Sequence, residues 1–212
     1  MKDETDLEKQ AVAEAAAALV RGGMRVGLGT GSTVAHLLPL LPARGVVYVA
    51  TSPHTEEAGR GLGLDVRPFA TLDRLDLALD GADQVSPSCW LVKGGGAAHT
   101  REKIVAAAAE RFVVLVSENK LVDAIRPPVP LELLAFGLPS TLRLLGEASL
   151  RDVPPSPDGN LIADYHGEVG DPAALAERLA ATPGVVEHGL FPPALVAEVL
   201  VATSSGIETM RP

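Results

Sequence analysis

The sequence contains very little cysteine, since Cys89 is the single one among 212 residues. One cysteine cannot form an internal disulfide, and it cannot supply the several thiolates of a structural zinc framework. Scarce cysteine also fits a reducing compartment without requiring one. Stability must therefore come from a hydrophobic core, and a hydrophobic content of 47% is ample for one.

Long apolar runs are also missing. No stretch of about 18 apolar residues occurs, so the sequence predicts no membrane-spanning helix. The first ten residues, MKDETDLEKQ, are charged and do not lead into the apolar segment of a secretory signal. We therefore expect a soluble, cytoplasmic protein with no membrane partner.

Positive charge is scarce: 18 Lys and Arg face 27 Asp and Glu, which gives a net charge of −9. Nucleic-acid binding depends on clustered cations, so we expect no nucleic-acid partner, and any anionic ligand must be met by a few local cations. Lysine is especially rare in this Arg-rich chain. A lysine provides a compact charge on a flexible stem and can mark a binding site, although surface solubility explains any single one equally well. The five lysines are Lys2, Lys9, Lys93, Lys103 and Lys120.

Hydrophobic patterns alternate between strand-like and helix-like segments in the first part of the chain. This alternation predicts an α/β fold with a Rossmann-like, open and mostly parallel sheet. The expected strands are residues 24–28, 46–50, 75–79 and 112–116, and the expected helices are 7–20, 34–41, 54–62 and one that contains Glu102.

The pattern changes at the segment Ala124–Pro128, after which the elements are short and interrupted by proline. We expect residues 128–195 to form a smaller α+β domain inserted near the C-terminus. The apolar run 195–202 would then return to the first sheet. The predicted domains are residues 1–127 with 196–212, and residues 128–195.

Ligands of open parallel sheets bind beyond the carboxyl ends of the strands, and the sequence GLGTGST at 27–33 falls at such a point. Its glycine spacing differs from the dinucleotide fingerprint, and no lysine follows Gly31 as in a nucleotide-binding P-loop. A bare turn beside the hydroxyls of Ser32 and Thr33 suits a small phosphate. The alternative is a tight turn in which Ser32 only caps a helix.

Two further motifs carry titratable groups. Asp80 ends an expected strand and Asp83 follows three residues later, so both carboxylates can face one cleft and shift each other's pKa; the alternative is an Asp-Gly turn with a capping Asp. In LVKGGGAAHTREK, three glycines after Lys93 let a ligand approach the backbone. Glu102 falls near a helix start, where we expect it to be ionised and available as a base, unless it interacts only with the helix dipole.

Together these segments resemble the ribose-5-phosphate isomerase A family, and the resemblance runs nearly end to end. It implies interconversion of D-ribose 5-phosphate and D-ribulose 5-phosphate in the non-oxidative pentose phosphate pathway, by a homo-oligomer, dimer or tetramer, without metal or organic cofactor. The matching segments are residues 27–33, DGADQ at 80–84, KGGGAAHTREKI at 93–104, SENKLV around Lys120, PVPLEL at 128–133, DGN at 158–160 and PGVVEHGLF at 183–191.

The resemblance also implies residue roles. Glu102 matches the general base, and Lys93 matches the lysine that stabilises the enediolate. Asp80 and Asp83 match the aspartates for ring opening and hydroxyl protons, without a division between them. Lys9 and Lys120 match phosphate contacts. The full set of implied substrate-binding residues is Lys9, Gly29, Thr30, Gly31, Ser32, Thr33, Gly81, Gly94, Gly95, Gly96 and Lys120.

Three departures from the family pattern stand out. Gln84 replaces a usual Glu, which we expect to loosen the positioning of Asp83. His99 replaces a usual Leu beside the base, where it could titrate near pH 6.5 or point to solvent. The segment TSPHT at 51–55 replaces a serine-rich turn, which puts substrate contacts from that loop in doubt.

Proteins of other classes share similar scaffolds. A sugar-phosphate sensor domain binds its ligand without turnover, but a transcription regulator should carry a basic helix-turn-helix, and the N-terminus offers no room for one. An aminosugar-phosphate deaminase should use a catalytic His, and a CoA transferase a nucleophilic Glu with a CoA site. The arrangement of acidic residues favours the isomerase.

Overall fold

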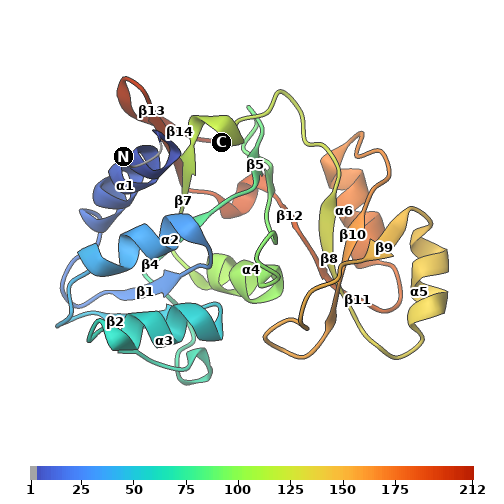
Figure 1. The fold of residues 1–212 in the computed structure, drawn as a ribbon, viewed down its shortest axis with the longest axis horizontal. Helices are drawn as coiled ribbons and strands as arrows, with labels where there is room; N and C mark the ends of the chain where they lie inside the picture. The colour runs from blue at the N-terminus through green and yellow to red at the C-terminus, as the bar shows by residue number, and fades with distance from the viewer. Residues whose placement is uncertain (1–3) are drawn as a thin grey trace.

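A seven-stranded sheet dominates one half of the molecule (Figure 1). The structure is a computed structural model that describes residues 4–212. The strand order is β14-β13-β7-β4-β1-β2-β3, and all neighbours are parallel except the β13–β14 hairpin. The predicted mostly parallel sheet is therefore confirmed, including the return of the last long strand beside β7. The strands are β1 (Arg25–Leu28), β2 (Val47–Ala50), β3 (Asp65–Val66), β4 (Leu77–Gly81), β7 (Phe112–Ser117), β13 (Glu198–Thr203) and β14 (Gly206–Met210).

Helices pack on both faces of this sheet because successive strand residues point to opposite sides. Helices α1 (Glu4–Ala17) and α2 (Ser32–Leu37) share a core with Leu77 and Leu79, whereas α4 (His99–Ala108) shares another with Ala78. Helix α3 (Pro53–Gly61) follows β2. The short 3₁₀ helices are η1 (Leu38–Leu40), η2 (Phe69–Thr71), η3 (Glu118–Lys120) and η4 (Pro193–Leu195). Among residues 4–212, none of the helices combines the length and the apolar character that crossing a bilayer requires.

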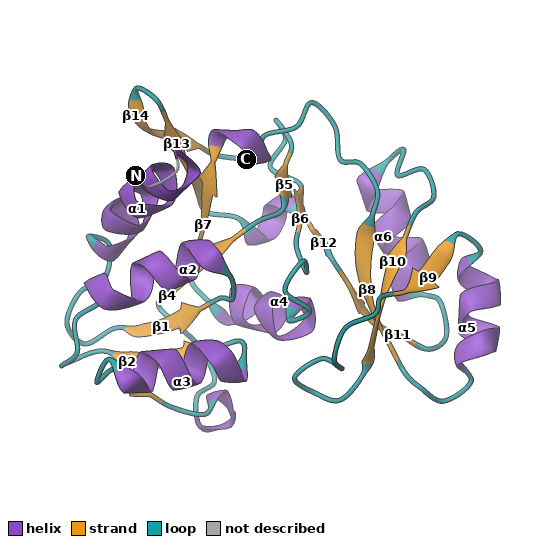
Figure 2. Cartoon of the chain, in the orientation of Figure 1, coloured by secondary structure: helices purple, strands orange, loops and turns teal. Residues whose placement is uncertain are grey.

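A four-stranded antiparallel sheet lies at the other end of the molecule (Figure 2). Its order is β11-β8-β10-β9, and it shares a separate core with its two helices. This is the α+β arrangement predicted for that part of the chain, while the two-domain boundaries remain a prediction. The elements are β8 (Val129–Leu133), α5 (Leu138–Leu145), β9 (Ala148–Leu150), β10 (Leu161–Tyr165), α6 (Pro172–Ala180) and β11 (Val185–His188).

A third, three-stranded antiparallel sheet was not predicted. It consists of β5 (Gln84–Val85), β6 (Leu91–Val92) and β12 (Leu190–Phe191), in the order β12-β6-β5, and Figure 2 shows it between the other two sheets. Lys93 follows β6, so it does not follow a strand of the main parallel sheet as expected. Strands of two residues are too short to show a hydrophobic period, and they form here through tertiary pairing.

Candidate active site

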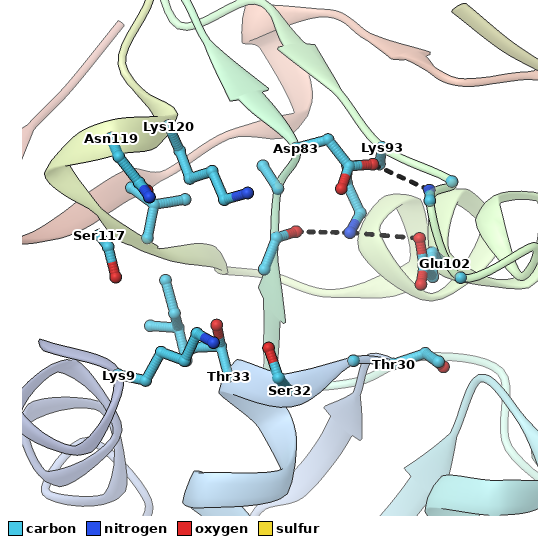
Figure 3. A pocket seen from close by; sticks show the side chains of 18 residues that line it. Lys9, Thr30, Ser32, Thr33, Asp83, Lys93, Glu102, Ser117, Asn119 and Lys120 are labelled. Carbon is cyan, nitrogen blue, oxygen red and sulfur yellow. Dashed lines mark hydrogen bonds and ion pairs between the residues drawn. The ribbon is translucent and has the colours of Figure 1, made fainter. Parts of the chain in front are cut away.

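A cavity of about 170 Å³ lies beyond the carboxyl ends of β1, β4 and β7 (Figure 3). The glycine loop, which we define as residues 93–96, closes one side of it. The cavity brings together most of the predicted site residues, whereas Asp80 and Gly29 are not part of its lining. The polar and glycine lining comprises Lys9, Thr30, Gly31, Ser32, Thr33, Gly81, Asp83, Lys93, Gly94, Gly95, Gly96, Glu102, Ser117, Asn119 and Lys120.

Lys93 joins two carboxylates at the wall of this cavity. Its Nζ lies 2.9 Å from Asp80 Oδ2 and 3.2 Å from Glu102 Oε2, and it also donates a hydrogen bond to the carbonyl of Gly81. All three ionisable side chains are almost completely buried, with Lys93 and Asp80 3% and Glu102 4% exposed. We call Asp80, Lys93 and Glu102 the buried triad. Two carboxyl groups share one ammonium, so the triad favours retention of a proton.

Asp80 is fixed from several sides. Its Oδ1 accepts hydrogen bonds from the backbone N–H groups of Gly81 at 2.8 Å and Thr30 at 3.3 Å. Gly29 leaves the space for this carboxylate, because a Cβ at that position would overlap it. Gly29 was predicted to bind substrate, but in the structure it makes room for Asp80. Asp80 itself contacts Lys93 behind the cavity wall.

Glu102 does not behave as its place near a helix start predicted. Burial, followed by the charge of Asp80, raises the pKa of Glu102 to about 8, and Lys93 offsets only part of this effect. The expectation of an ordinarily ionised carboxylate was therefore wrong, because desolvation outweighs the helix dipole. Oε2 of Glu102 receives no hydrogen bond from any residue among 4–212. This oxygen is buried, and its close polar contact is the ion pair with the Lys93 ammonium at 3.2 Å.

The pKa values of Lys93 and Asp80 are both raised, which favours the charged form of Lys93 and the neutral form of Asp80. Burial lowers the pKa of Lys93, but the charges of Asp80 and Glu102 outweigh this effect and leave that pKa raised, so Lys93 is cationic. Burial raises the pKa of Asp80, against the opposing effect of Lys93. Lys93 is therefore a cation beside two carboxyl groups whose pKa values lie above those of carboxyl groups in water.

The glycine loop approaches its surroundings too closely for side chains. Gly94 has φ 110°, and a Cβ there would lie 2.7 Å from Nδ1 of His99 and 2.8 Å from Cβ of Pro130. The N–H of Gly95 donates to Oδ2 of Asp83 at 2.8 Å. Asp83 is exposed and lines the cavity. The two predicted aspartates thus differ, since Asp83 faces the ligand space and Asp80 faces Lys93.

The turn before α2 presents backbone groups to the cavity. Gly31 occupies the N-cap position with φ 118°, and within residues 4–212 no side chain caps this helix. The alternative reading of Ser32 as an N-cap is therefore wrong, because Ser32 is the first helical residue. The uncapped N–H groups at a helix start remain available to a ligand.

The segment at 51–55 supports this turn and does not line the cavity. The hydroxyls of Thr30 and Thr51 lie 2.8 Å apart, and the Thr55 hydroxyl donates to the carbonyl of Gly29 at 3.0 Å. Ser52 caps α3 through the N–H of Thr55.

Cations gather at the opposite side of the cavity from the buried triad. Figure 3 shows Lys9, from α1, and Lys120, from η3, extending toward the same space, while Asp83, Lys93 and Glu102 lie on the other side. Ser117 and Asn119 also line this end and were missed by sequence reasoning. Ser117 is the last residue of β7 and Asn119 follows in η3, so their position could have identified them, because ligand sites lie at the carboxyl ends of parallel strands.

Gln84 and His99, two of the departures from the family pattern, have surroundings that the sequence did not predict. The amide of Gln84 exchanges two hydrogen bonds, of 2.8 and 2.9 Å, with the backbone of Arg126, and the expected loosening of Asp83 stays a prediction. His99 neither points to solvent nor titrates near pH 6.5, because it is 0% exposed and burial lowers its pKa to about 4. His99 is thus a neutral core residue behind the glycine loop.

The structure is thus an α/β protein in which two carboxyl groups share one ammonium at a polar cavity beyond the carboxyl ends of parallel strands. Residues 47–206 match the model of the family described as ribose 5-phosphate isomerase A (phosphoriboisomerase A). The ribose-5-phosphate isomerase A of Roseiflexus castenholzii is 47% identical, over 87% of this chain and 87% of the relative. The chain belongs to the ribose 5-phosphate isomerase A family.

Solved structures agree with this assignment. Ribose 5-phosphate isomerase A of Methanocaldococcus jannaschii superposes with a TM-score of 0.92 and 34% identity, over 99% of this chain and 100% of that one. A D-ribose-5-phosphate isomerase solved in complex with phospho-erythronic acid has the same TM-score and 32% identity, over 99% and 100% of the two chains. The likeness therefore extends over the whole fold.

Proposed function

We propose that the cavity isomerises D-ribose 5-phosphate to D-ribulose 5-phosphate, and the reverse, through an enediol or enediolate. The reaction belongs to the non-oxidative branch of the pentose phosphate pathway. One observation carries the residue assignment: Lys93 bridges Asp80 and Glu102 at one side of a cavity whose other side presents Lys9 and Lys120. A sugar bound between the two sides has its phosphate near the lysines and its reacting carbons near the triad.

Glu102 is the general base in this proposal. It removes the proton from C2 of the open-chain aldose and returns a proton to C1, so that no atom is gained or lost. A base works best when its pKa lies near the working pH, and the pKa of about 8 meets this requirement. Its carboxylate lines the cavity and is the acceptor for the carbon-bound proton.

Lys93 stabilises the negative charge that develops on the sugar oxygen. A buried ammonium acts strongly here because little water screens it, and its position is fixed before the substrate binds. Asp80 holds that ammonium in place through the 2.9 Å ion pair and is not part of the cavity lining. We therefore assign Asp80 to positioning.

Asp83 is the residue for ring opening and for proton transfer between the sugar hydroxyls. It lines the cavity, and the N–H of Gly95 holds one of its oxygens. The other oxygen can accept the proton of the anomeric hydroxyl and give it to the ring oxygen, as the C1 carbonyl forms and the bond between C1 and the ring oxygen breaks. This gives the two aspartates separate tasks.

The phosphate binds at the lysine side of the cavity, beside the backbone of Gly31, Ser32 and Thr33. Asn119 and Ser117 add polar groups at this side. The phospho-erythronic acid complex of a related isomerase supports a phosphorylated ligand for this site. The remaining predicted contacts, Thr30, Gly81, Gly94 and Gly96, surround the sugar between the two sides.

Several properties implied by the family complete the proposal. We propose a cytoplasmic homo-oligomer, either a dimer or a tetramer, that acts without metal or organic cofactor. The division into residues 1–127 with 196–212 and residues 128–195 is also proposed, supported by the separate cores of the main and four-stranded sheets.

An assay of ketose formation tests this function. Purified protein should convert ribose 5-phosphate to ribulose 5-phosphate, and unphosphorylated ribose should be a far poorer substrate. EDTA should leave the rate unchanged. Binding of ribose 5-phosphate without ketose formation would instead indicate a sensor, and loss of activity on chelation would contradict the cofactor-free mechanism.

A further inference from the structure

Arg151 connects the four-stranded sheet to the glycine loop. It follows β9, and its Nη1 donates to the carbonyls of Gly94 at 3.0 Å and Gly95 at 3.3 Å. The loop thus has two attachments of opposite polarity: its carbonyls accept from Arg151, while the N–H of Gly95 donates to Asp83. A peptide group held at both ends has a defined orientation.

The guanidinium is itself held rigidly. Nε lies 2.9 Å from Oδ2 of Asp164 and Nη2 lies 2.5 Å from Oδ1, which is a bidentate pair. Asp164 is part of β10, the strand that pairs with β9. Both side chains are largely buried, at 20% and 17% exposed. Such a planar fork fixes the direction of the remaining N–H donors, which a lysine cannot do.

Arg151 is not part of the cavity lining formed by the described residues. Its route to the cavity is the glycine loop, whose carbonyls it contacts. From these contacts we propose that Arg151, held by Asp164, is a positioning residue that orients the Gly94–Gly95 backbone and thereby Asp83 for the isomerisation. This inference rests on the proposed function of the cavity.

The test compares the kinetics of Arg151→Ala with those of wild type and of Arg25→Ala. Arg25 also forms a two-point pair with an aspartate, Asp76, but it lies at the amino end of β1, opposite the cavity. Arg151→Ala should lower kcat by about 10- to 100-fold with a small change in KM, because misplaced groups slow the reaction more than they weaken binding. Arg25→Ala should lose thermal stability but keep kcat.

Two further measurements separate positioning from a merely structural ion pair. Millimolar methylguanidinium should restore part of the activity of Arg151→Ala and none in Arg25→Ala. Arg151→Lys should remain impaired, and Asp164→Asn should show a smaller loss of kcat in the same direction. Wild-type kcat in a folded Arg151→Ala variant, or an equal loss in Arg25→Ala without chemical rescue, would overturn the inference. A wild-type protein that does not convert ribose 5-phosphate would instead refute the proposed function itself.

Discussion

The ammonium of Lys93 lies 3.2 Å from Oε2 of Glu102, and both groups are buried at the wall of one cavity. Asp80 places a second carboxyl group beside the same ammonium, so two acidic groups share one positive charge. Burial and this extra negative charge keep the pKa of Glu102 near neutrality, where a carboxylate can both accept and return a proton.

The pH dependence of turnover follows from this arrangement. The base form of Glu102 forms as pH rises, so kcat/KM should increase with pH and reach half of its maximum near pH 8, with an apparent pKa that belongs to the coupled triad. Asp80→Asn removes a negative charge that raises the pKa of Glu102, so the acid limb of the pH profile, where activity rises with pH, should move to lower pH. Glu57→Gln, an exposed change in α3, is the control. A wild-type acid limb near the ordinary carboxyl pKa would contradict this assignment.

Removal of the buried cation should harm both stability and activity. Lys93→Ala leaves Asp80 and Glu102 without a counter-charge, which costs about 3–5 kcal/mol of unfolding free energy in comparable buried pairs. The loss should be larger at pH 8 than at pH 5, since protonation of the carboxyl groups at the lower pH removes their repulsion. Chemical denaturation at the two pH values measures this difference. An equal loss at both would show that the three charges are not coupled.

The lysine side of the cavity should govern affinity for the phosphate. Lys9→Ala and Lys120→Ala should each raise KM for ribose 5-phosphate by about 10-fold, because each variant loses about one charge-assisted hydrogen bond to the phosphate. The effect on kcat should be smaller. Inhibition by inorganic phosphate should weaken in parallel. Arg143→Ala, an exposed change in α5, should alter neither. Unchanged KM and phosphate inhibition in both lysine variants would place the phosphate elsewhere.

His99 should make the fold sensitive to acid. Its folded-state pKa is lowered to about 4 from an ordinary value of 6.5. The stability associated with neutral His99 is therefore complete above pH 6.5 and is lost as pH falls toward 4, because the unfolded chain takes up the proton first.

His99→Leu should remove part of this acid sensitivity. Neither ring nitrogen of His99 has a hydrogen-bond partner among residues 4–212, so an apolar side chain also suits the site. The variant should gain about 1–2 kcal/mol relative to wild type at pH 5 and less at pH 7. Thermal melting at both pH values measures this difference. Since His188 also has a lowered pKa, His99→Leu should retain some acid sensitivity.

Most of the main sheet could be predicted because each long strand shows its own hydrophobic run. The strands β2 and β7 coincide closely with the predicted segments 46–50 and 112–116. The helix predicted at 7–20 begins and ends three residues earlier, at Glu4 and Ala17. Alanine-rich sequence carries little information on helix ends, which local propensity sets only weakly.

The site was predictable in its residue types and less so in its geometry. The spacing of Asp80 and Asp83 suggested that both face one cleft, but Asp80 pairs with Lys93 and only Asp83 lines the cavity. The pKa of Glu102 depends on burial by distant segments, which no local pattern reveals. Arg151 was not identified because it lies more than fifty residues from the loop carbonyls that it contacts.

The role of Glu102 is the central claim, and proton NMR in deuterated buffer with EDTA tests it most directly. Wild type should convert ribose 5-phosphate to ribulose 5-phosphate with solvent deuterium incorporated at C1, the carbon that receives the transferred proton. Glu102→Gln should bind the sugar but lower kcat by about 10²–10⁴-fold or more, because the base acts in the transition state. If Glu102→Gln exchanged and isomerised the substrate as fast as wild type, Glu102 would not be the base.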